Sequence, residues 1–231
     1  MEPAFALNEA EESAAFVWCV PLECSASMER ELSALLAPVE AARAARFATR
    51  DDKRRYVVSH AALRLILSAF TGRDSHAIHI ATGARGMPYM KSSGPHFSLS
   101  RGGGVALVAV TTEGPIGVDV ERVRPDLELD TFSRPLVPRA DVDRIDALPP
   151  EEQSRAWFQA WTRLEAVVKA SGKGLSDDGV ADLDAPPPFR IWNLDVDETR
   201  VGAVATVPSV AHVVYDAFPN VSSVLARFGP A

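Results

Sequence analysis

Two long helical stretches, each followed by several short apolar segments, constrain the fold of this 231-residue chain more than any other feature. The spacing of apolar residues predicts one helix over about residues 51–70, ended by Gly72, and another over about residues 151–170, ended by Gly172. Gly and Pro residues then divide the sequence after each helix into segments of strand length. The order of helix and then strands therefore occurs twice. This predicts an α+β fold of two pseudo-symmetric lobes, each with a long helix packed on a small antiparallel sheet.

The other predicted elements are shorter. Strands are expected over residues 14–20, 77–81, 96–99, 105–111, 116–121, 189–194, 201–207 and 212–217. Short helices are expected over residues 28–36 and 141–148, and the Pro-rich stretch 123–150 is expected to cross irregularly between the lobes. We place an N-terminal lobe at residues 1–115 and a C-terminal lobe at residues 116–231.

Composition is typical of a soluble globular protein, with 47% hydrophobic and 24% charged residues. No apolar run approaches the roughly 20 residues that a membrane span requires, and the first twelve residues lack the Lys or Arg that opens a secretory signal. The two cysteines, Cys19 and Cys24, suggest neither a disulfide framework nor a zinc site. We therefore expect a cytoplasmic protein that does not act at a membrane.

Charge is distributed unevenly along the chain. The net charge of −7 argues against a general nucleic-acid binder, yet residues 41–75 contain eight Lys or Arg against three acidic residues. Taken alone, such a run favours a solvated helix face, and the alternative is a site for phosphate or an acidic partner.

The segment from Gly117 to Glu121 alternates between apolar and other residues. A strand here would turn Val118 and Val120 toward the core and place Asp119 and Glu121 on the opposite face. Two carboxylates at this spacing can share Mg²⁺, which prefers oxygen ligands and takes further contacts from substrate phosphates. Taken alone, the pattern is also that of an ordinary strand with an acidic outer face.

A second polar pair lies in the second long helix. Glu165 and Lys169 are four residues apart and therefore share one face, with Trp161 one turn earlier. By itself this arrangement favours a surface salt bridge beside a core tryptophan.

Together, the two segments resemble the surfactin-synthetase type of the 4′-phosphopantetheinyl transferase superfamily. The resemblance covers residues 40–175 in the family's order: the basic stretch ending at Arg55, then Gly86–Pro88, Phe97–Ser100, Gly117–Glu121 and Trp161–Leu175. It implies two α+β lobes in one monomeric chain, with coenzyme A and Mg²⁺ between them. It also implies transfer of the 4′-phosphopantetheine group of coenzyme A to a serine of an apo acyl, peptidyl or aryl carrier protein of fatty acid, polyketide or nonribosomal peptide synthesis, with release of adenosine 3′,5′-bisphosphate.

The resemblance assigns roles only where residues match. It implies Mg²⁺ ligands at Asp119, Glu121 and Glu165, with Glu165 also the base for the incoming serine, Lys169 on the pyrophosphate and Asp141 as an accessory acid. The residues that it places around coenzyme A are Arg43, Arg55, Arg85, Met87, Pro88, Ser100 and Arg101.

Three positions depart from the family's pattern. Met87 stands where the family has Lys, Arg101 where it has His, and Leu164 where it has a Lys before the helix glutamate. Arg101 would supply a permanent cation with a forked set of donors, and Arg85 or Arg163 would supply charge nearby. The departures leave open a relative that binds coenzyme A or a carrier protein without turnover. An unrelated magnesium phosphohydrolase would leave the ordered match from Gly86 to Leu175 unexplained.

Overall fold

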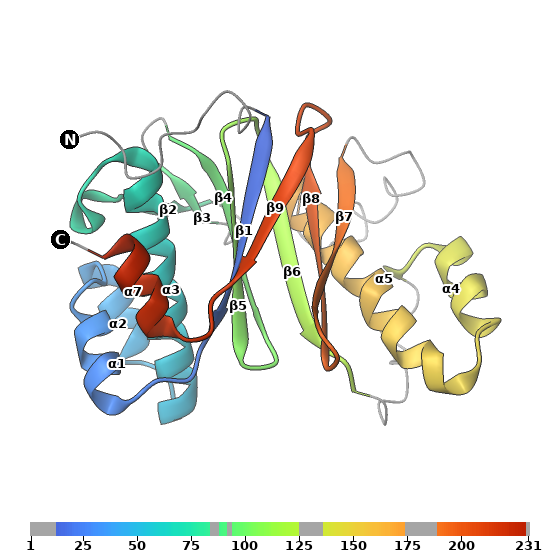
Figure 1. Ribbon diagram of the computed structural model, residues 1–231, viewed down its shortest axis with the longest axis horizontal. Helices are drawn as coiled ribbons and strands as arrows, with labels where there is room; N and C mark the ends of the chain where they lie inside the picture. The colour runs from blue at the N-terminus through green and yellow to red at the C-terminus, as the bar shows by residue number, and fades with distance from the viewer. Residues whose placement is uncertain (1–12, 84–87, 92–93, 125–135, 174–188, 230–231) are drawn as a thin grey trace.

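A computed structural model describes residues 13–83, 88–91, 94–124, 136–173 and 189–229 (Figure 1). Both long helices are present, as α3 (Arg50–Thr71) and α5 (Pro150–Ser171). Each ends at a glycine in the left-handed conformation, Gly72 with φ 65° and Gly172 with φ 68°, where a residue with a Cβ would be strained. Among the described residues, no helix is both long enough and apolar enough to cross a membrane.

The strands form two larger sheets and one small one. The first sheet has the order β4-β5-β1-β9, the second β6-β8-β7, and β2 pairs with β3. The strands are β1 (Ala14–Pro21), β2 (Ile80–Thr82), β3 (Pro88–Met90), β4 (His96–Gly102), β5 (Val105–Thr111), β6 (Ile116–Arg122), β7 (Arg190–Asp197), β8 (Arg200–Thr206) and β9 (His212–Ala217). Every described pair is antiparallel except β1 with β9, which is parallel. The predicted α+β class is confirmed.

The two larger sheets face each other between two sets of helices (Figure 1). On β1, Phe16 and Trp18 point into the core beneath α3, while Val17 points into a second core between the sheets. That second core also contains Leu107 of β5 and Val118 of β6. The short helices α1 (Ala26–Ser33), α2 (Pro38–Ala44) and α7 (Val221–Phe228) lie on the α3 side, and α4 (Arg139–Asp146) packs against α5. Apolar side chains therefore cover both faces of β1. One face packs under α3, and the other packs against the second sheet, so β1 and β5 contribute to both cores.

The strand predicted at residues 77–81 is wrong in its position. Residues 75–77 form a 3₁₀ turn, and β2 begins only at Ile80. The buried Arg64 of α3 donates hydrogen bonds to the carbonyl oxygens of Ser75, at 2.6 Å, and Ile78, at 3.0 Å. These carbonyl groups therefore bind a guanidinium instead of a neighbouring strand.

The last described elements return to the first half of the chain. β9 pairs with β1, and α7 contacts α3, with the rings of Phe228 and Trp18 5.8 Å apart. The predicted lobe boundary between residues 115 and 116 stays a prediction. The first sheet contains β9 from beyond that boundary, and its layer of helices contains α7. Helices α2 and α7 were not expected from the sequence.

Candidate active site

Strands β4 and β6 lie next to each other although they belong to different sheets. The amide of Val118 donates a hydrogen bond to the hydroxyl of Ser98 at 3.1 Å, and β4 and β6 are in extensive contact. Helix α5 covers the other side of β6 and approaches it closely at Gly117. A Cβ at this position would lie 2.0 Å from the carbonyl oxygen of Ala166 and 2.5 Å from the amide of Ala170. Glycine is therefore needed for α5 to bring its polar face onto the strand.

This contact places a lysine from α5 on an aspartate of β6. Lys169 Nζ lies 2.7 Å from Asp119 Oδ1, and it also donates to Ser100 Oγ at 3.0 Å and to the carbonyl oxygen of Val118 at 3.1 Å. Ser100 Oγ in turn donates to Asp119 Oδ1 at 2.7 Å. Asp119 is only 4% exposed, and its other oxygen, Oδ2, is buried without a hydrogen-bond partner among the described residues. A buried carboxylate oxygen without a donor is costly unless something positive meets it.

Two further carboxylates, on the same strand and on α5, are coupled to Asp119. Burial raises the pKa of Glu121, and the negative charge of Asp119 raises it further. Burial likewise raises the pKa of Glu165, again reinforced by Asp119 and opposed by Lys169. Among the described residues, no group of three His, Cys, Asp or Glu side chains is already positioned to hold a metal ion. The free oxygen of Asp119 and the two crowded glutamates are nevertheless the donor set that suits a hard divalent cation.

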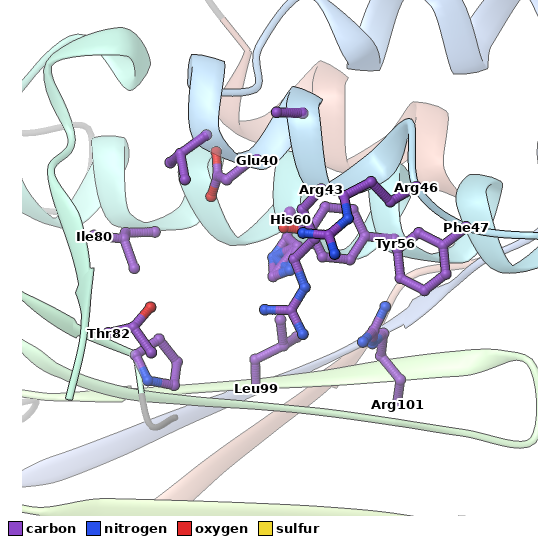
Figure 2. A pocket seen from close by; sticks show the side chains of 13 residues that line it. Glu40, Arg43, Arg46, Phe47, Tyr56, His60, Ile80, Thr82, Leu99 and Arg101 are labelled. Atoms are coloured by element: carbon purple, nitrogen blue, oxygen red, sulfur yellow. The ribbon is translucent and has the colours of Figure 1, made fainter. Parts of the chain in front are cut away.

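A pocket of about 850 Å³ lies on the other face of β4 (Figure 2). Its walls come from α2, α3 and the strands β2, β3 and β4. The lining residues are Val39, Glu40, Ala42, Arg43, Arg46, Phe47, Tyr56, His60, Ile80, Thr82, Pro88, Leu99 and Arg101. We call it the arginine pocket, after Arg43, Arg46 and Arg101.

The arginine pocket carries an excess of positive charge. Glu40, the one carboxylate among its described lining residues, is bound by Arg64 at 2.6 Å and also accepts a hydrogen bond from the Ala37 amide at 2.8 Å. The guanidinium carbons of Arg43 and Arg101 lie 5.7 and 5.5 Å from the centre of the Tyr56 ring (Figure 2). Like charges gathered in one cavity favour an anionic ligand such as a phosphate.

The two sites are separated by a single strand. Leu99 and Arg101 line the pocket. On the opposite face of the strand, Ser98 accepts a hydrogen bond from β6, and Ser100 belongs to the group that it forms with Asp119 and Lys169, which we call the lysine cluster. β4 is the outermost strand of its sheet. The two sites are therefore only one strand apart, a separation that suits a ligand with anionic groups at two separate positions.

Comparison with known proteins identifies the family. The model of the 4′-phosphopantetheinyl transferase superfamily matches residues 115–216. The 4′-phosphopantetheinyl transferase HetI of Nostoc sp. is 30% identical over 203 residues, which cover 82% of this chain and 86% of the relative. The chain belongs to the 4′-phosphopantetheinyl transferase superfamily. Two such transferases of Bacillus subtilis are also similar, one 27% identical over 75% of this chain and 83% of its own length, and Sfp 26% identical over 64% and 65%.

Within this family framework, the structure places most of the predicted residues in one of the two sites. Asp119, Glu121, Glu165, Lys169 and Ser100 belong to the lysine cluster or are coupled to it. Arg43, Arg101 and Pro88 line the arginine pocket. Arg85 and Met87 lie outside the described residues.

Two predicted residues lie elsewhere. Arg55 is not among the described residues that line the arginine pocket; its side chain is 45% exposed, 4.0 Å from Asp52. Asp141 forms an ion pair with Arg144 and lies 3.6 Å from Arg163, so two arginines already bind its carboxylate. Ligand contacts by Arg55 and an acid role for Asp141 stay predictions.

The departure at Leu164 has a structural explanation. Its side chain is 4% exposed and belongs to the core that α5 shares with α4. A lysine could not be accommodated there without burying its charge.

Most of the lining residues were not expected as site residues from the sequence, among them Arg46, Tyr56 and His60. Arg46 lies in the basic stretch, so charge alone could have suggested it. Tyr56 and His60 lie within the predicted long helix, where only the position of α2 shows which face meets a ligand.

Proposed function

We propose that this protein transfers the 4′-phosphopantetheine group from coenzyme A to a serine of an apo carrier protein and releases adenosine 3′,5′-bisphosphate. The observation that carries the proposal is the pair of sites on the two faces of β4, one with three arginines and the other with Lys169 beside three carboxylates. Coenzyme A has anionic groups at two separate positions, a 3′-phosphate and a pyrophosphate. The family membership supports the same reaction, since the similar proteins of Nostoc and Bacillus subtilis are 4′-phosphopantetheinyl transferases.

Each of the two anionic groups of coenzyme A has a suitable site. The 3′-phosphate would occupy the arginine pocket, where Arg43, Arg46 and Arg101 can donate charge-assisted hydrogen bonds. The pyrophosphate would lie near Lys169, whose ammonium group already bridges α5, β4 and β6. Lys169 would then exchange part of its contact with Asp119 for the phosphate oxygens.

Mg²⁺ is the proposed cofactor. Asp119, through its free Oδ2, together with Glu121 and Glu165 would hold the ion. When bound, it would withdraw negative charge from the pyrophosphate. Burial and the charge of Asp119 raise the pKa values of both glutamates, and a bound cation would offset both effects.

The chain's own residues supply the proton transfer and the positioning. As the serine oxygen of the carrier forms its bond to the phosphorus of the phosphopantetheine group, the bond from that phosphorus to the bridging oxygen of adenosine 3′,5′-bisphosphate breaks. Glu165 would take the serine proton, and its raised pKa brings it closer to the working pH, as suits a general base. The arginines would retain the departing bisphosphate by its 3′-phosphate, so orientation and electrostatics supply most of the rate.

A direct assay tests the proposal. The protein is incubated with coenzyme A, Mg²⁺ and a panel of apo acyl, peptidyl and aryl carrier proteins. The mass of each intact carrier is then measured by mass spectrometry. We expect at least one carrier to gain the mass of one phosphopantetheine group. The gain should be absent when the acceptor serine is Ala, and it should be strongly reduced in the Asp119→Asn variant. No gain with any carrier, while a known transferase modifies the same panel, would contradict the proposal.

A further inference from the structure

The arginine pocket contains an imidazole, that of His60, which the proposed function does not use. His60 lies on α3 one turn after Tyr56 and lines the pocket with it (Figure 2). The two rings meet edge to face with their centres 3.9 Å apart. Because Arg43 and Arg101 lie over the same tyrosine, the imidazole is next to the place where an anion would be held.

The surroundings of His60 keep it uncharged. The charged groups around it are Glu40 and Arg43 from α2, Arg64 on its own helix α3, and Arg101 from β4, with Tyr56 as the titratable neighbour. Glu40 is already bound by Arg64, so it gives the imidazole no counter-ion. Burial, reinforced by the three arginines, lowers the pKa of His60 to about 3. At neutral pH the ring therefore carries a single N–H group.

The hydrogen bonding around the ring indicates which nitrogen carries that proton. His60 Nδ1 is buried and has no hydrogen-bond partner among the described residues. A buried N–H without an acceptor is rarer in proteins than an acceptor without a donor. The proton therefore belongs on Nε2, and the ring can present a neutral donor to the pocket.

We propose that His60 is a ligand-contacting residue, whose Nε2–H donates a hydrogen bond to an oxygen of the phosphate that Arg43, Arg46 and Arg101 surround. The inference rests on the proposed function, in which the 3′-phosphate of coenzyme A occupies the arginine pocket. A fourth cation there would add repulsion in the empty pocket, whereas a neutral donor adds a hydrogen bond without it. His60 thus helps to distinguish a ligand with this phosphate from one without it.

Calorimetric titration of three proteins tests the inference. Coenzyme A and dephospho-coenzyme A are titrated into the wild type, His60→Leu, which removes the donor, and His60→Gln, whose amide N–H can replace Nε2–H. We expect His60→Leu to bind coenzyme A about tenfold more weakly, since the acceptor is charged. Its affinity for dephospho-coenzyme A should stay within about twofold of wild type, and His60→Gln should recover most of the lost affinity. Equal losses for the two ligands, or no loss for coenzyme A, would overturn the inference.

The wild type separates this inference from the proposed function. If it binds the two ligands equally well, the pocket does not recognise the 3′-phosphate, and the proposed placement of coenzyme A is overturned together with the role of His60. If it prefers coenzyme A and His60→Leu keeps that preference, only the role of His60 is overturned.

A nitrogen-15 spectrum of the imidazole in the wild type needs no variant to fold. We expect the Nε2–H form near neutral pH, with a shifted Nε2 proton after addition of coenzyme A but not of dephospho-coenzyme A. A proton on Nδ1, or identical spectra with the two ligands, would overturn the inference.

Discussion

At the scale of single residues, the two carboxylate oxygens of Asp119 differ in their hydrogen bonding. Oδ1 accepts hydrogen bonds from Lys169 and Ser100, while Oδ2 is buried and accepts none from the part of the chain that the structure describes. Lys169 offsets the charge of this aspartate. Burial, followed by the charge of Asp119, nevertheless raises the pKa values of Glu121 and Glu165. This arrangement of carboxylates is therefore suited to binding at some expense of stability, as is common at functional sites.

The first prediction is that Glu165→Gln stabilises the protein in buffer without divalent cations. The folded-state pKa of Glu165 lies above its ordinary value of 4.5, so the folded protein keeps a proton that the unfolded chain loses as the pH rises. The free energy of unfolding therefore falls as the pH rises from the unfolded-state pKa of Glu165 to its folded-state pKa. Gln does not titrate, so the variant does not lose this stability. We expect little difference near about pH 4 and a higher melting temperature for the variant near about pH 7.5. The gain should not exceed roughly 2–4 °C, because the side chain is half-buried and solvent screens its charge.

Added Mg²⁺ supplies the control for this prediction. It should raise the melting temperature of the wild type and change that of Glu165→Gln much less, because ligand binding stabilises only the protein that binds it. A variant that melts below the wild type near neutral pH without Mg²⁺ would contradict the argument.

The second prediction concerns two arginines that the family resemblance treats alike. Arg101 lines the arginine pocket beside Tyr56, whereas Arg55 is 45% exposed and is not among the described lining residues. We expect Arg101→Ala to weaken coenzyme A binding by tenfold or more, since a hydrogen bond to a charged group contributes about 1.5–3 kcal/mol. The loss for dephospho-coenzyme A should be small.

Arg55→Ala is the matched control, because it removes the same charge at a distance from the pocket. Its affinity for coenzyme A should stay within about threefold of wild type, as expected for a surface charge. Titration of both variants with both ligands decides the matter. Equal effects of the two substitutions would show that the bound phosphate lies outside the pocket.

At the scale of elements, the approach of α5 to β6 sets the geometry of the lysine cluster. Gly117 is the residue that permits it, since its Cα faces the backbone of α5 at Ala166 and Ala170. Glu165 and Lys169 lie on that same helix. Any outward movement of α5 would therefore move Lys169 away from Asp119.

The third prediction is that Gly117→Ala destabilises the protein by about 1–3 kcal/mol, the usual cost of overpacking, and removes most transferase activity. The added methyl group meets backbone atoms, which cannot rotate away as a side chain end can. Gly172→Ala is the control at the end of the same helix: no atom of the described residues lies within 4 Å of an added Cβ there, so the strain of φ 68° is the expected cost. That variant should lose about 1 kcal/mol of stability and keep its activity. Stability is measured by urea unfolding and activity by intact carrier mass, and an active Gly117→Ala would contradict the argument.

Elements with strong periodicity could be predicted from the sequence, and those defined by distant partners could not. Helices α3 and α5 were expected to within a few residues, because their apolar faces and terminal glycines are local signals. Helix α2 has only seven residues, and it is fixed by the distant pair between Glu40 and Arg64. The same guanidinium displaces the start of β2. Arg46 and His60 were missed as site residues because the arginine pocket exists only once α2 lies against α3.

The division between the two sites was likewise only partly visible in the sequence. The spacing of Asp119 and Glu121, and of Glu165 and Lys169, predicted which side chains share a face. It could not predict that Lys169 and Ser100 would bind the same oxygen of Asp119, since that requires β4 and β6 to come together from different sheets.

At the scale of the whole molecule, the two larger sheets share one core. It contains Val17 and Leu107 from the first sheet and Ile116, Val118 and Val204 from the second. Separating the sheets would expose these side chains, at about 1.5–3 kcal/mol each. The cost of exposing five of them, roughly 10 kcal/mol, is comparable with the whole stability of a typical domain. Neither half is therefore expected to persist once the other has unfolded.

The last prediction is that both halves unfold in a single transition, which variants with one tryptophan can test. Trp18 lies in β1 beneath α3, and Trp157 is 2% exposed in the core between α4 and α5. One variant keeps only Trp18 and another keeps only Trp157, with the remaining tryptophans replaced by Phe. In each variant, fluorescence reports one half and far-UV circular dichroism reports all of the helices and strands. Because both signals come from the same protein, any change of stability caused by the substitutions affects them equally. We expect coincident urea midpoints in both variants, the signature of two-state unfolding. A fluorescence midpoint that departs from the circular dichroism midpoint in either variant would show that the shared core does not couple the two halves.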